Sequence, residues 1–279
     1  MLIRLLRLFA HLPLSAIQFL GIIAGWLTYW SSPTYAARMR ENLRGSALSR
    51  DENDFRKLLH ASIAEAGKGV TETFAVWFRD QETVLQWVRE CRGWQYVEDA
   101  LAKKKGIIFL TPHLGCFEIT ALYYASRHPM SVLYRPPRKA WLTPLIEAGR
   151  SRKNIQLAPT NMQGVRSLLK ALKQGEAVGI LPDQVPGAGE GEWEDFFGKP
   201  AYTMTLVRKL AQTTGATVLM AFGERLPHGK GYIIHIEPEN VSTGLNAAIE
   251  RVIRNRPEQY LWGYNRYKTP RGAPANPLQ

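Results

Sequence analysis

Residues 111–118, which read TPHLGCFE, hold the side chains whose types and spacing most suggest chemistry. His113 and Glu118 stand five positions apart in this stretch. A carboxylate that accepts a hydrogen bond from one ring nitrogen of a histidine fixes the tautomer, so the other nitrogen can take a proton from a hydroxyl. We therefore expect His113 to act as a general base that Glu118 orients, with the substrate's own alcohol as the nucleophile.

Other interpretations of this stretch stay open. His113 is equally well explained as a loop histidine with satisfied hydrogen bonds, beside a glutamate that favours a helix N-terminus. A metal site is less expected, since zinc-binding histidines on a helix usually come as a pair, and we expect neither a metal nor a cofactor. Cys116 as a nucleophile competes with the commoner case of a lone buried thiol.

The elements around this stretch place it at the ligand-binding edge of a sheet. After Lys105, short apolar runs such as GIIFLTP and EAVGILP alternate with helical patterns such as GVRSLLKALKQG. This alternation predicts an α/β fold with a mainly parallel or mixed central sheet flanked by helices. Ligands of such sheets bind beyond the carboxyl ends of the strands, so His113 is expected in a loop at that edge and Glu118 in the first turn of the next helix.

Further polar residues follow neighbouring units and reach the same edge. Asp183 and Gln184 come after the strand EAVGIL, Arg135 follows the strand MSVLY, and Arg150 ends a helix that begins near Trp141. We expect Asp183 to orient a basic residue or the acceptor, and the arginines to reach the reacting groups. A turn aspartate after a proline and solvated arginines explain the same positions.

Composition and charge bound the class of protein. The chain has 279 residues, of which 45% are hydrophobic, and this suits one large α/β domain with an extension. The net charge of +12 favours a polyanionic partner, namely nucleic acid, an anionic membrane or phosphorylated and acidic substrates. No nucleic-acid-binding module is apparent. The two cysteines, Cys91 and Cys116, exclude a zinc ribbon and indicate a reducing compartment.

The N-terminal segment predicts membrane contact. Residues 12–30 run for 19 positions without a formal charge, close to the roughly 20 apolar residues that cross a hydrocarbon core. Basic residues flank both ends, so a spanning helix and an in-plane or re-entrant anchor both stay open, and a buried helix of a soluble core is the remaining alternative. Gly21 and Gly25 form a GxxxG, which marks a helix dimer contact or, more often, close packing.

The chain is divided accordingly into four parts. Residues 1–30 are expected to form a membrane anchor helix, and residues 31–100 a helical lead-in with apolar side chains at helical spacing. Residues 101–268 form the α/β domain, and residues 269–279 a flexible tail.

Taken together, the motifs resemble those of the lysophospholipid acyltransferase superfamily, whose signature is His, four residues, then Asp or Glu. Within it the chain is similar to the late acyltransferases of lipid A biosynthesis. His113 and Glu118 supply the signature. Five further blocks follow in the family's order, and they are YRPPRKAWLTPLIEAGRSR, GILPDQVPGAGEG, FFGKPAYT, LAQTTGA and PEQYLWGYNRYK.

The resemblance implies what the chain does. It implies an acyltransferase without a cofactor, with an acyl carrier protein thioester as donor and a phosphorylated lipid A precursor as acceptor. It also implies the cytoplasmic face of the anionic inner membrane of a Gram-negative cell, and Arg150 as the third functional residue. Phe197 and Gly198 are expected to wall the acyl channel, although isolated residues of this kind more often lie in a core. The segment EWEDFF departs from the family, because Glu194 and Asp195 stand where its pattern is more apolar.

Two rival classes remain. A glycerophospholipid-type lysophosphatidate acyltransferase shares the histidine–carboxylate signature and differs in its acceptor-binding blocks. A non-enzymatic basic membrane adaptor gives no reason for a histidine–carboxylate pair at a sheet edge. Release of thiol from an acyl-thioester donor only when a hydroxyl acceptor is present separates the enzymes from the adaptor.

Overall fold

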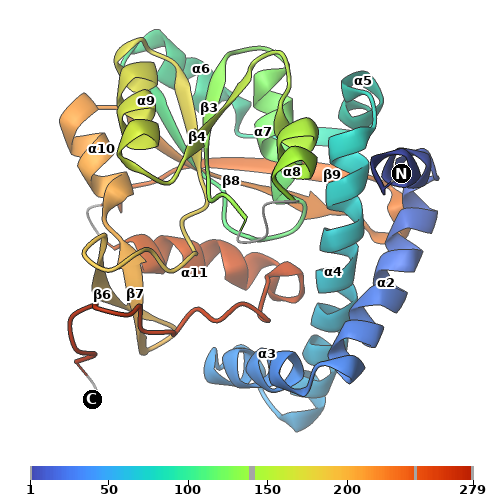
Figure 1. Cartoon of the computed structure of the whole chain (residues 1–279). Coiled ribbons are helices and arrows are strands. Elements are labelled where there is room, and N and C mark those ends of the chain that lie inside the picture. The colour runs from blue at the N-terminus through green and yellow to red at the C-terminus, as the bar shows by residue number, and fades with distance from the viewer. Residues whose placement is uncertain (1, 138–141, 242–243, 278–279) are drawn as a thin grey trace.

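A seven-stranded sheet with helices on both faces forms the centre of the molecule (Figure 1). The structure is a computed structural model that describes residues 2–137, 142–241 and 244–277. Its strands are β1 (Val88–Arg92), β2 (Ile107–Leu110), β3 (Met130–Tyr134), β4 (Ile155–Pro159), β5 (Ala177–Ile180), β6 (Gly191–Phe196), β7 (Lys199–Met204), β8 (Thr217–Arg225) and β9 (Tyr232–Pro238). Its longer helices are α1 (Leu2–Ala10), α2 (Leu14–Ser31), α3 (Pro33–Gly45), α4 (Glu52–Phe78), α5 (Gln81–Leu85), α6 (Trp94–Ala102), α7 (Phe117–Ala125), α8 (Thr143–Arg150), α9 (Met162–Lys173), α10 (Leu206–Thr214) and α11 (Leu245–Asn255), with short 3-10 turns η2 (Pro227–Gly229) and η4 (Pro257–Gln259).

The sheet has the strand order β1-β9-β8-β2-β5-β3-β4. Its pairs are parallel except for β8 with β9, so the prediction of a mainly parallel or mixed sheet flanked by helices is confirmed. Strand β2 lies between β8 and β5, and its four residues are all buried. Ile108 and Leu110 belong to one core cluster, whereas Ile107 and Phe109 belong to the other. Both faces of the strand are therefore covered, which explains its unbroken apolar sequence.

Two regions that form strands were not predicted as strands from the sequence. The hairpin of β6 and β7 lies apart from the central sheet. Strand β1 falls in the stretch expected to be a helical lead-in, and it pairs with β9 at the edge of the sheet. Its sequence VRECR is charged and mostly exposed or half-buried, so it carries no apolar alternation from which a strand could be inferred.

The N-terminal helices form a layer beside the sheet. Helix α2 runs alongside the long helix α4, which separates it from the sheet (Figure 1). A Cβ on Gly67 of α4 would lie 2.0 Å from the Gly21 carbonyl oxygen, and one on Gly25 would lie 2.3 Å from the Ile63 carbonyl oxygen. The glycines therefore serve close packing within the chain, as the commoner interpretation of the GxxxG expects. By length and composition alone, α2 could cross a membrane, and 28% of it is buried.

The closing helix ends where the sequence predicts. Helix α11 stops at Asn255, two residues before Pro257, and its inner face is buried in the main core. Helix α8 ends at Arg150 as expected, while its expected start near Trp141 lies outside the described residues.

Candidate active site

His113 lies in the loop between β2 and α7, at the carboxyl edge of the sheet, as the sequence predicts. Its ring Nδ1 lies 2.9 Å from Oδ1 of Asp183, and its backbone N–H donates to Oδ2 of the same carboxylate at 2.9 Å. Asp183 follows β5, which is the parallel neighbour of β2. The carboxylate therefore holds the histidine by its ring and its backbone at once.

Asp183 is ionised in this setting. Burial alone would raise the pKa of its carboxyl, but the charge of His113 and the hydrogen bonds that His113 donates outweigh burial and lower that pKa below its ordinary value. An ionised carboxylate only accepts hydrogen bonds, so Nδ1 of His113 carries a proton in the charged and in the neutral ring, and in the neutral ring Nε2 is left with a free lone pair. The Gln184 amide nitrogen lies 3.4 Å from that Nε2.

Glu118 has a different partner from the expected one. It sits in the first turn of α7, as predicted, but its carboxylate accepts hydrogen bonds from Nε and Nη2 of Arg150, with Nε at 3.0 Å from Oε1. The side chains of Arg150 and Glu118 are 17% and 10% exposed. The expected hydrogen bond between Glu118 and His113 is thus wrong in this structure, because Asp183 takes that place.

The corner between the two residues explains the difference. Gly115 has a φ of 61°, and a Cβ there would lie 2.1 Å from the Gly223 carbonyl oxygen. The backbone N–H of Cys116 donates to that same oxygen at 2.8 Å. Because these contacts hold the backbone at Gly115 and Cys116 against Gly223, the chain turns there. His113 therefore faces the loop after β5, while Glu118 faces the end of α8. A spacing of five residues on a straight helix does not encode this turn.

His113 and Arg150 line one cleft of about 650 Å³, and Glu118 lies behind Arg150 outside it. Arg135 and Gln184 line the same cleft, so four of the expected site residues meet there. Much of the remaining wall is apolar, and it includes Leu133, Ile146, Val165, Leu181, Met204 and Leu206. A cleft with this lining can take an alkyl chain beside a proton acceptor and a fixed guanidinium.

Three of the five expected substrate-binding residues do not line the cleft: Asp183, which holds His113, and the pair Phe197 and Gly198. Phe197 and Gly198 form the turn of the β6–β7 hairpin and do not line the cleft. Phe197 is 8% exposed and packs on Trp262, so it is a core residue, as the general tendency of such residues predicts. The opposite end of the hairpin reaches the cleft, through Met204 and the preceding loop.

Three other residues at the site were not predicted from the sequence. Trp77 of α4 lines the cleft, with the Arg150 guanidinium 5.4 Å from the centre of its ring. Lys209 of α10 also lines the cleft. Tyr260 lies close to Asp183, and burial, followed by the charge of Asp183, raises the pKa of Tyr260 well above its ordinary value, so it stays protonated.

Comparison with known proteins decides the family. The sequence model described as bacterial lipid A biosynthesis acyltransferase matches residues 1–269. The chain belongs to this family. It is 29% identical over 285 residues to the lipid A biosynthesis lauroyltransferase of Escherichia coli (strain K12), with 98% of this chain and 92% of the relative covered. It is 26% identical over 274 residues to the lipid A biosynthesis palmitoleoyltransferase of the same strain, with 95% and 89% covered. It is 22% identical over 256 residues to the myristoyltransferase of that strain, with 84% and 78% covered.

This protein is therefore an acyltransferase of lipid A biosynthesis. In the segment EWEDFF, which was expected to depart from the family pattern, Glu194 has a structural role. The carboxylate of Glu194 accepts a hydrogen bond from the Asn246 backbone N–H at 2.9 Å in the first turn of α11, away from the catalytic cleft. The buried thiol of Cys116 does not line the cleft either, and burial raises its pKa far above the ordinary range, which disfavours a thiolate nucleophile.

Proposed function

We propose that the enzyme moves a fatty acyl chain from an acyl carrier protein thioester to a hydroxyl of a phosphorylated lipid A precursor. One observation carries the mechanism. The His113–Asp183 pair turns Nε2 of His113 toward a largely apolar cleft that Arg150 also lines. The reaction takes place at the cytoplasmic face of the bacterial inner membrane, where an acyl carrier protein and the lipid precursor can meet.

In the chemical step, Nε2 of His113 takes the proton of the acceptor hydroxyl while that oxygen attacks the thioester carbonyl carbon. The carbonyl becomes a tetrahedral oxyanion, and its collapse breaks the carbon–sulfur bond. The departing thiolate takes the proton from the imidazolium, which restores His113. Asp183 holds the ring in the required tautomer and stabilises the imidazolium that forms.

Arg150 and Gln184 are the donors available to the oxyanion. Both side chains line the cleft with His113. Glu118 and the ring of Trp77 fix the guanidinium of Arg150, so its N–H groups need no large rearrangement when charge develops. Glu118 is thus a positioning residue in this mechanism and Asp183 is the carboxylate of the dyad.

The cleft also provides for anionic substrates. Arg135 and Lys209 are exposed side chains that line it, and both carry charge toward solvent. They are suited to phosphate groups of the acceptor or to the acidic surface of the carrier. The apolar lining suits the acyl chain.

The test is product formation from purified components. The enzyme is incubated with an acyl carrier protein thioester and a lipid A precursor, and the acylated lipid is measured by mass spectrometry. We expect product with the wild type, a rate lowered about 10²- to 10⁴-fold with His113→Ala, and the wild-type rate with His128→Ala, a histidine at the other end of α7 that stacks on Trp94. Equal transfer to lysophosphatidate would favour the glycerophospholipid alternative, and full activity of His113→Ala would refute the mechanism.

A further inference from the structure

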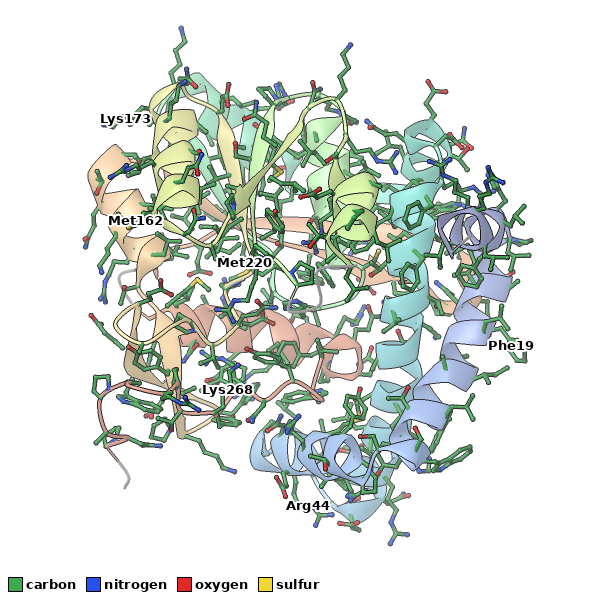
Figure 2. All side chains as sticks on the ribbon, in the orientation of Figure 1. Phe19, Arg44, Met162, Lys173, Met220 and Lys268 are labelled. Carbon is green, nitrogen blue, oxygen red and sulfur yellow. The ribbon has the colours of Figure 1, made fainter. Side chains whose placement is uncertain are left out.

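The outer surface of α2 is apolar along its length. Its exposed large side chains are Phe19, Leu20, Ile23, Leu27 and Trp30, with exposed fractions between 40% and 69%. At 3.6 residues per turn, these positions fall within about 100° of arc. Phe19 points away from the rest of the protein (Figure 2). Leu5 and Leu8 of α1 are 55% and 68% exposed, so the apolar surface continues onto the first helix.

The inner surface of α2 is bound to the domain by polar contacts. Its buried positions, Leu14, Ile17, Gln18, Gly21 and Gly25, occupy the opposite side of the helix. Gln18 is 3% exposed; its amide nitrogen donates to Glu72 at 2.7 Å and its amide oxygen accepts from the backbone of Gly229 at 3.0 Å. Glu72 in turn binds Arg225, which is 2% exposed by its side chain. An apolar helix that spans alone has no need of such contacts.

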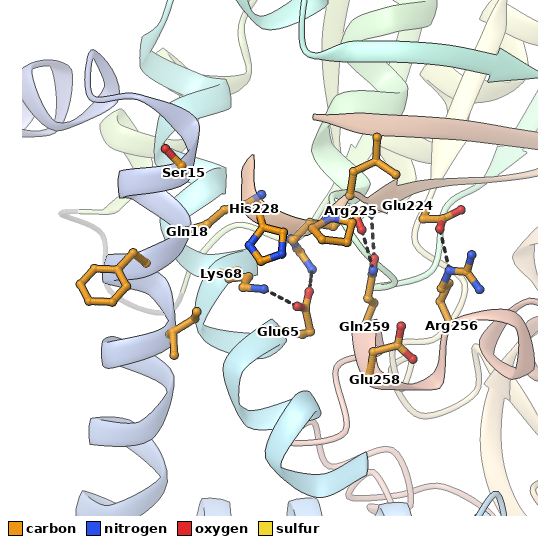
Figure 3. Close-up of a pocket in the computed structure, with 14 residues that line it drawn as sticks. Ser15, Gln18, Glu65, Lys68, Glu224, Arg225, His228, Arg256, Glu258 and Gln259 are labelled. Carbon is orange, nitrogen blue, oxygen red and sulfur yellow. Dashed lines mark hydrogen bonds and ion pairs between the residues drawn. The ribbon is translucent and has the colours of Figure 1, made fainter. Parts of the chain in front are cut away.

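A cavity lies beside the inner side of α2, and charged side chains form part of its wall. It has a volume of about 710 Å³ and separates part of α2 from the end of β8 and from η4 (Figure 3). Glu65, Lys68, Arg256 and Glu258 line it. If α2 crossed the bilayer, α4 and these charged groups would enter the hydrocarbon with it, at a large cost in free energy.

Both ends of α2 are fixed to the same side of the domain. Before its start, the carbonyl oxygens of Ala10 and Leu12 accept hydrogen bonds from the guanidinium of Arg79, at 3.1 Å each. Near its end, the Trp26 ring packs against His60 of α4, and the helix continues almost directly into α3. If α2 spanned the bilayer, its two ends would lie in different compartments. Both ends are bound to one rigid domain, which cannot lie in two compartments at once.

We propose that α1 and α2 anchor the enzyme in one leaflet of an anionic bilayer, with α2 lying in the plane of the membrane and not crossing it. The proposal rests on the membrane location given above, and it concerns how the chain sits there. Arg4 and Arg7, both exposed on α1, stand beside Leu5 and Leu8 and meet the anionic headgroups. Trp30 lies at the end of the stripe, in the interfacial position that tryptophan favours.

Topology is tested by single cysteines at the two ends of α2. Leu12→Cys and Ser31→Cys are each placed in the full chain with Cys91→Ser and Cys116→Ser, and treated with a membrane-impermeant maleimide. We expect both positions to react in inverted inner-membrane vesicles and neither in right-side-out spheroplasts. Reaction from opposite sides would overturn the in-plane anchor, even if the protein is an active, membrane-bound acyltransferase.

Depth is tested by a fluorophore on Phe19→Cys or Leu27→Cys in phosphatidylglycerol vesicles, with Tyr96→Cys on α6 as the control. We expect shallow lipid-borne quenchers to act more strongly than bilayer-centre quenchers at the α2 positions, with no quenching at the control. Strongest quenching from the bilayer centre would indicate a span, and no quenching with a dimer in light scattering would indicate a second copy on the stripe. Either result would refute the proposal.

The contribution of the stripe is tested by vesicle sedimentation. Leu27→Glu should weaken binding by about tenfold to a hundredfold, since burial of one leucine side chain is worth about 1.5–3 kcal/mol. Tyr96→Glu introduces the same charge on another exposed apolar residue and should leave binding unchanged. Because the Leu27 side chain is 58% exposed, the melting temperature of the Leu27→Glu variant should match that of the wild type. Equal binding by both variants would contradict the proposal.

Discussion

Two arginine–glutamate sites differ in what surrounds them. At the sheet edge, Arg150 binds Glu118 and still lines a cleft, with side chains 17% and 10% exposed. Between α4 and β8, Arg225 binds Glu72 and Glu65, and the Arg225 and Glu72 side chains are 2% and 0% exposed. The first arginine can meet a substrate, whereas the second is covered by the protein. In the proposed mechanism, the same residue types therefore serve catalysis in one place, while they serve architecture in the other.

The comparison extends to the neighbouring residues. Gln18 links the inner network to α2, and Gln259 links it to the chain after α11 through two hydrogen bonds with the Arg225 backbone, each of 2.9 Å. At the cleft, Gln184 faces His113 and makes a contact of 3.4 Å. Loss of the inner network should thus affect folding, and loss of the cleft residues should affect turnover.

The largest expected effect is on turnover at His113. His113→Ala should lower kcat by about 10²- to 10⁴-fold, the range of general base catalysis. Asp183→Asn should cost a similar amount, and the double variant little more than His113→Ala, because both act through one imidazole. The melting temperature of His113→Ala should change little. If the loss of kcat in the double variant equalled the product of the two single losses, the two residues would act independently.

The second effect is on stability at Glu72. Glu72→Gln should destabilise the protein by about 3–5 kcal/mol, because it leaves a buried guanidinium without its main partner. The melting temperature should then fall by on the order of 10 °C, with turnover per folded molecule retained. Glu118→Gln is the matched control, since it should move the melting temperature far less. A catalytic defect in folded Glu72→Gln would break the distinction between the two sites.

A smaller effect on kcat is expected at Arg150 and Glu118, which form an ion pair beside the cleft. Arg150→Lys and Glu118→Gln should each lower kcat by roughly 10- to 100-fold, because Lys lacks the planar fork of donors and a neutral amide holds Arg150 less firmly. The effect should persist at saturating donor and at high salt, where exposed charges are screened. Wild-type turnover of Arg150→Ala under those conditions would make Arg150 a surface charge.

The stability that Asp183 contributes should depend on pH in a way that an ordinary carboxylate would not show. The pKa of Asp183 is lowered in the fold, so its contribution to stability is fully present above the unfolded value of about 3.9 and is lost as pH falls through the lower folded value. The stability difference between wild type and Asp183→Asn should therefore shrink below about pH 4. Melting temperatures from pH 6 downward, at roughly half-unit steps, measure it; a difference that stays constant with pH would mean that Asp183 is not ionised in the fold.

The smallest effect is expected at Cys116. Cys116→Ser should leave kcat within about twofold, because the substrate hydroxyl is the nucleophile in the proposed mechanism and the thiol lies outside the cleft. A modest loss of stability is expected from a hydroxyl in a buried site, on the order of 1 kcal/mol. A loss of turnover comparable to that of His113→Ala would revive a cysteine mechanism.

The sequence predicts which residues lie at the carboxyl edge of the sheet better than it predicts which of their side chains pair with one another. The apolar run of β2 and the polar residues after β2, β3 and β5 located His113, Arg135 and Asp183 correctly. The choice of Asp183 over Glu118 depends on β5 lying next to β2, although many residues separate them in the chain. Strand order depends on packing of the whole sheet, so local spacing favoured the nearer carboxylate.

The positions of Phe197 and of strand β1 also depend on packing between distant parts of the chain, which the local sequence does not show. Phe197 was expected to wall the acyl channel, with a core position as the alternative, and it packs in the core at the tip of the β6–β7 hairpin. Strand β1 is defined by its pairing with β9, which a charged edge sequence does not signal.

Asp183, and not Glu118, holds the imidazole of His113 in this structure. The most direct measurement is the tautomer of His113 by NMR of the ¹⁵N-histidine-labelled protein at neutral pH, with His113→Gln to assign its signals. We expect His113 to carry its proton on Nδ1 in the wild type and in Glu118→Gln, and to lose this preference in Asp183→Asn. Loss of the Nδ1–H tautomer in Glu118→Gln, with its retention in Asp183→Asn, would instead make Glu118 the residue that orients the ring.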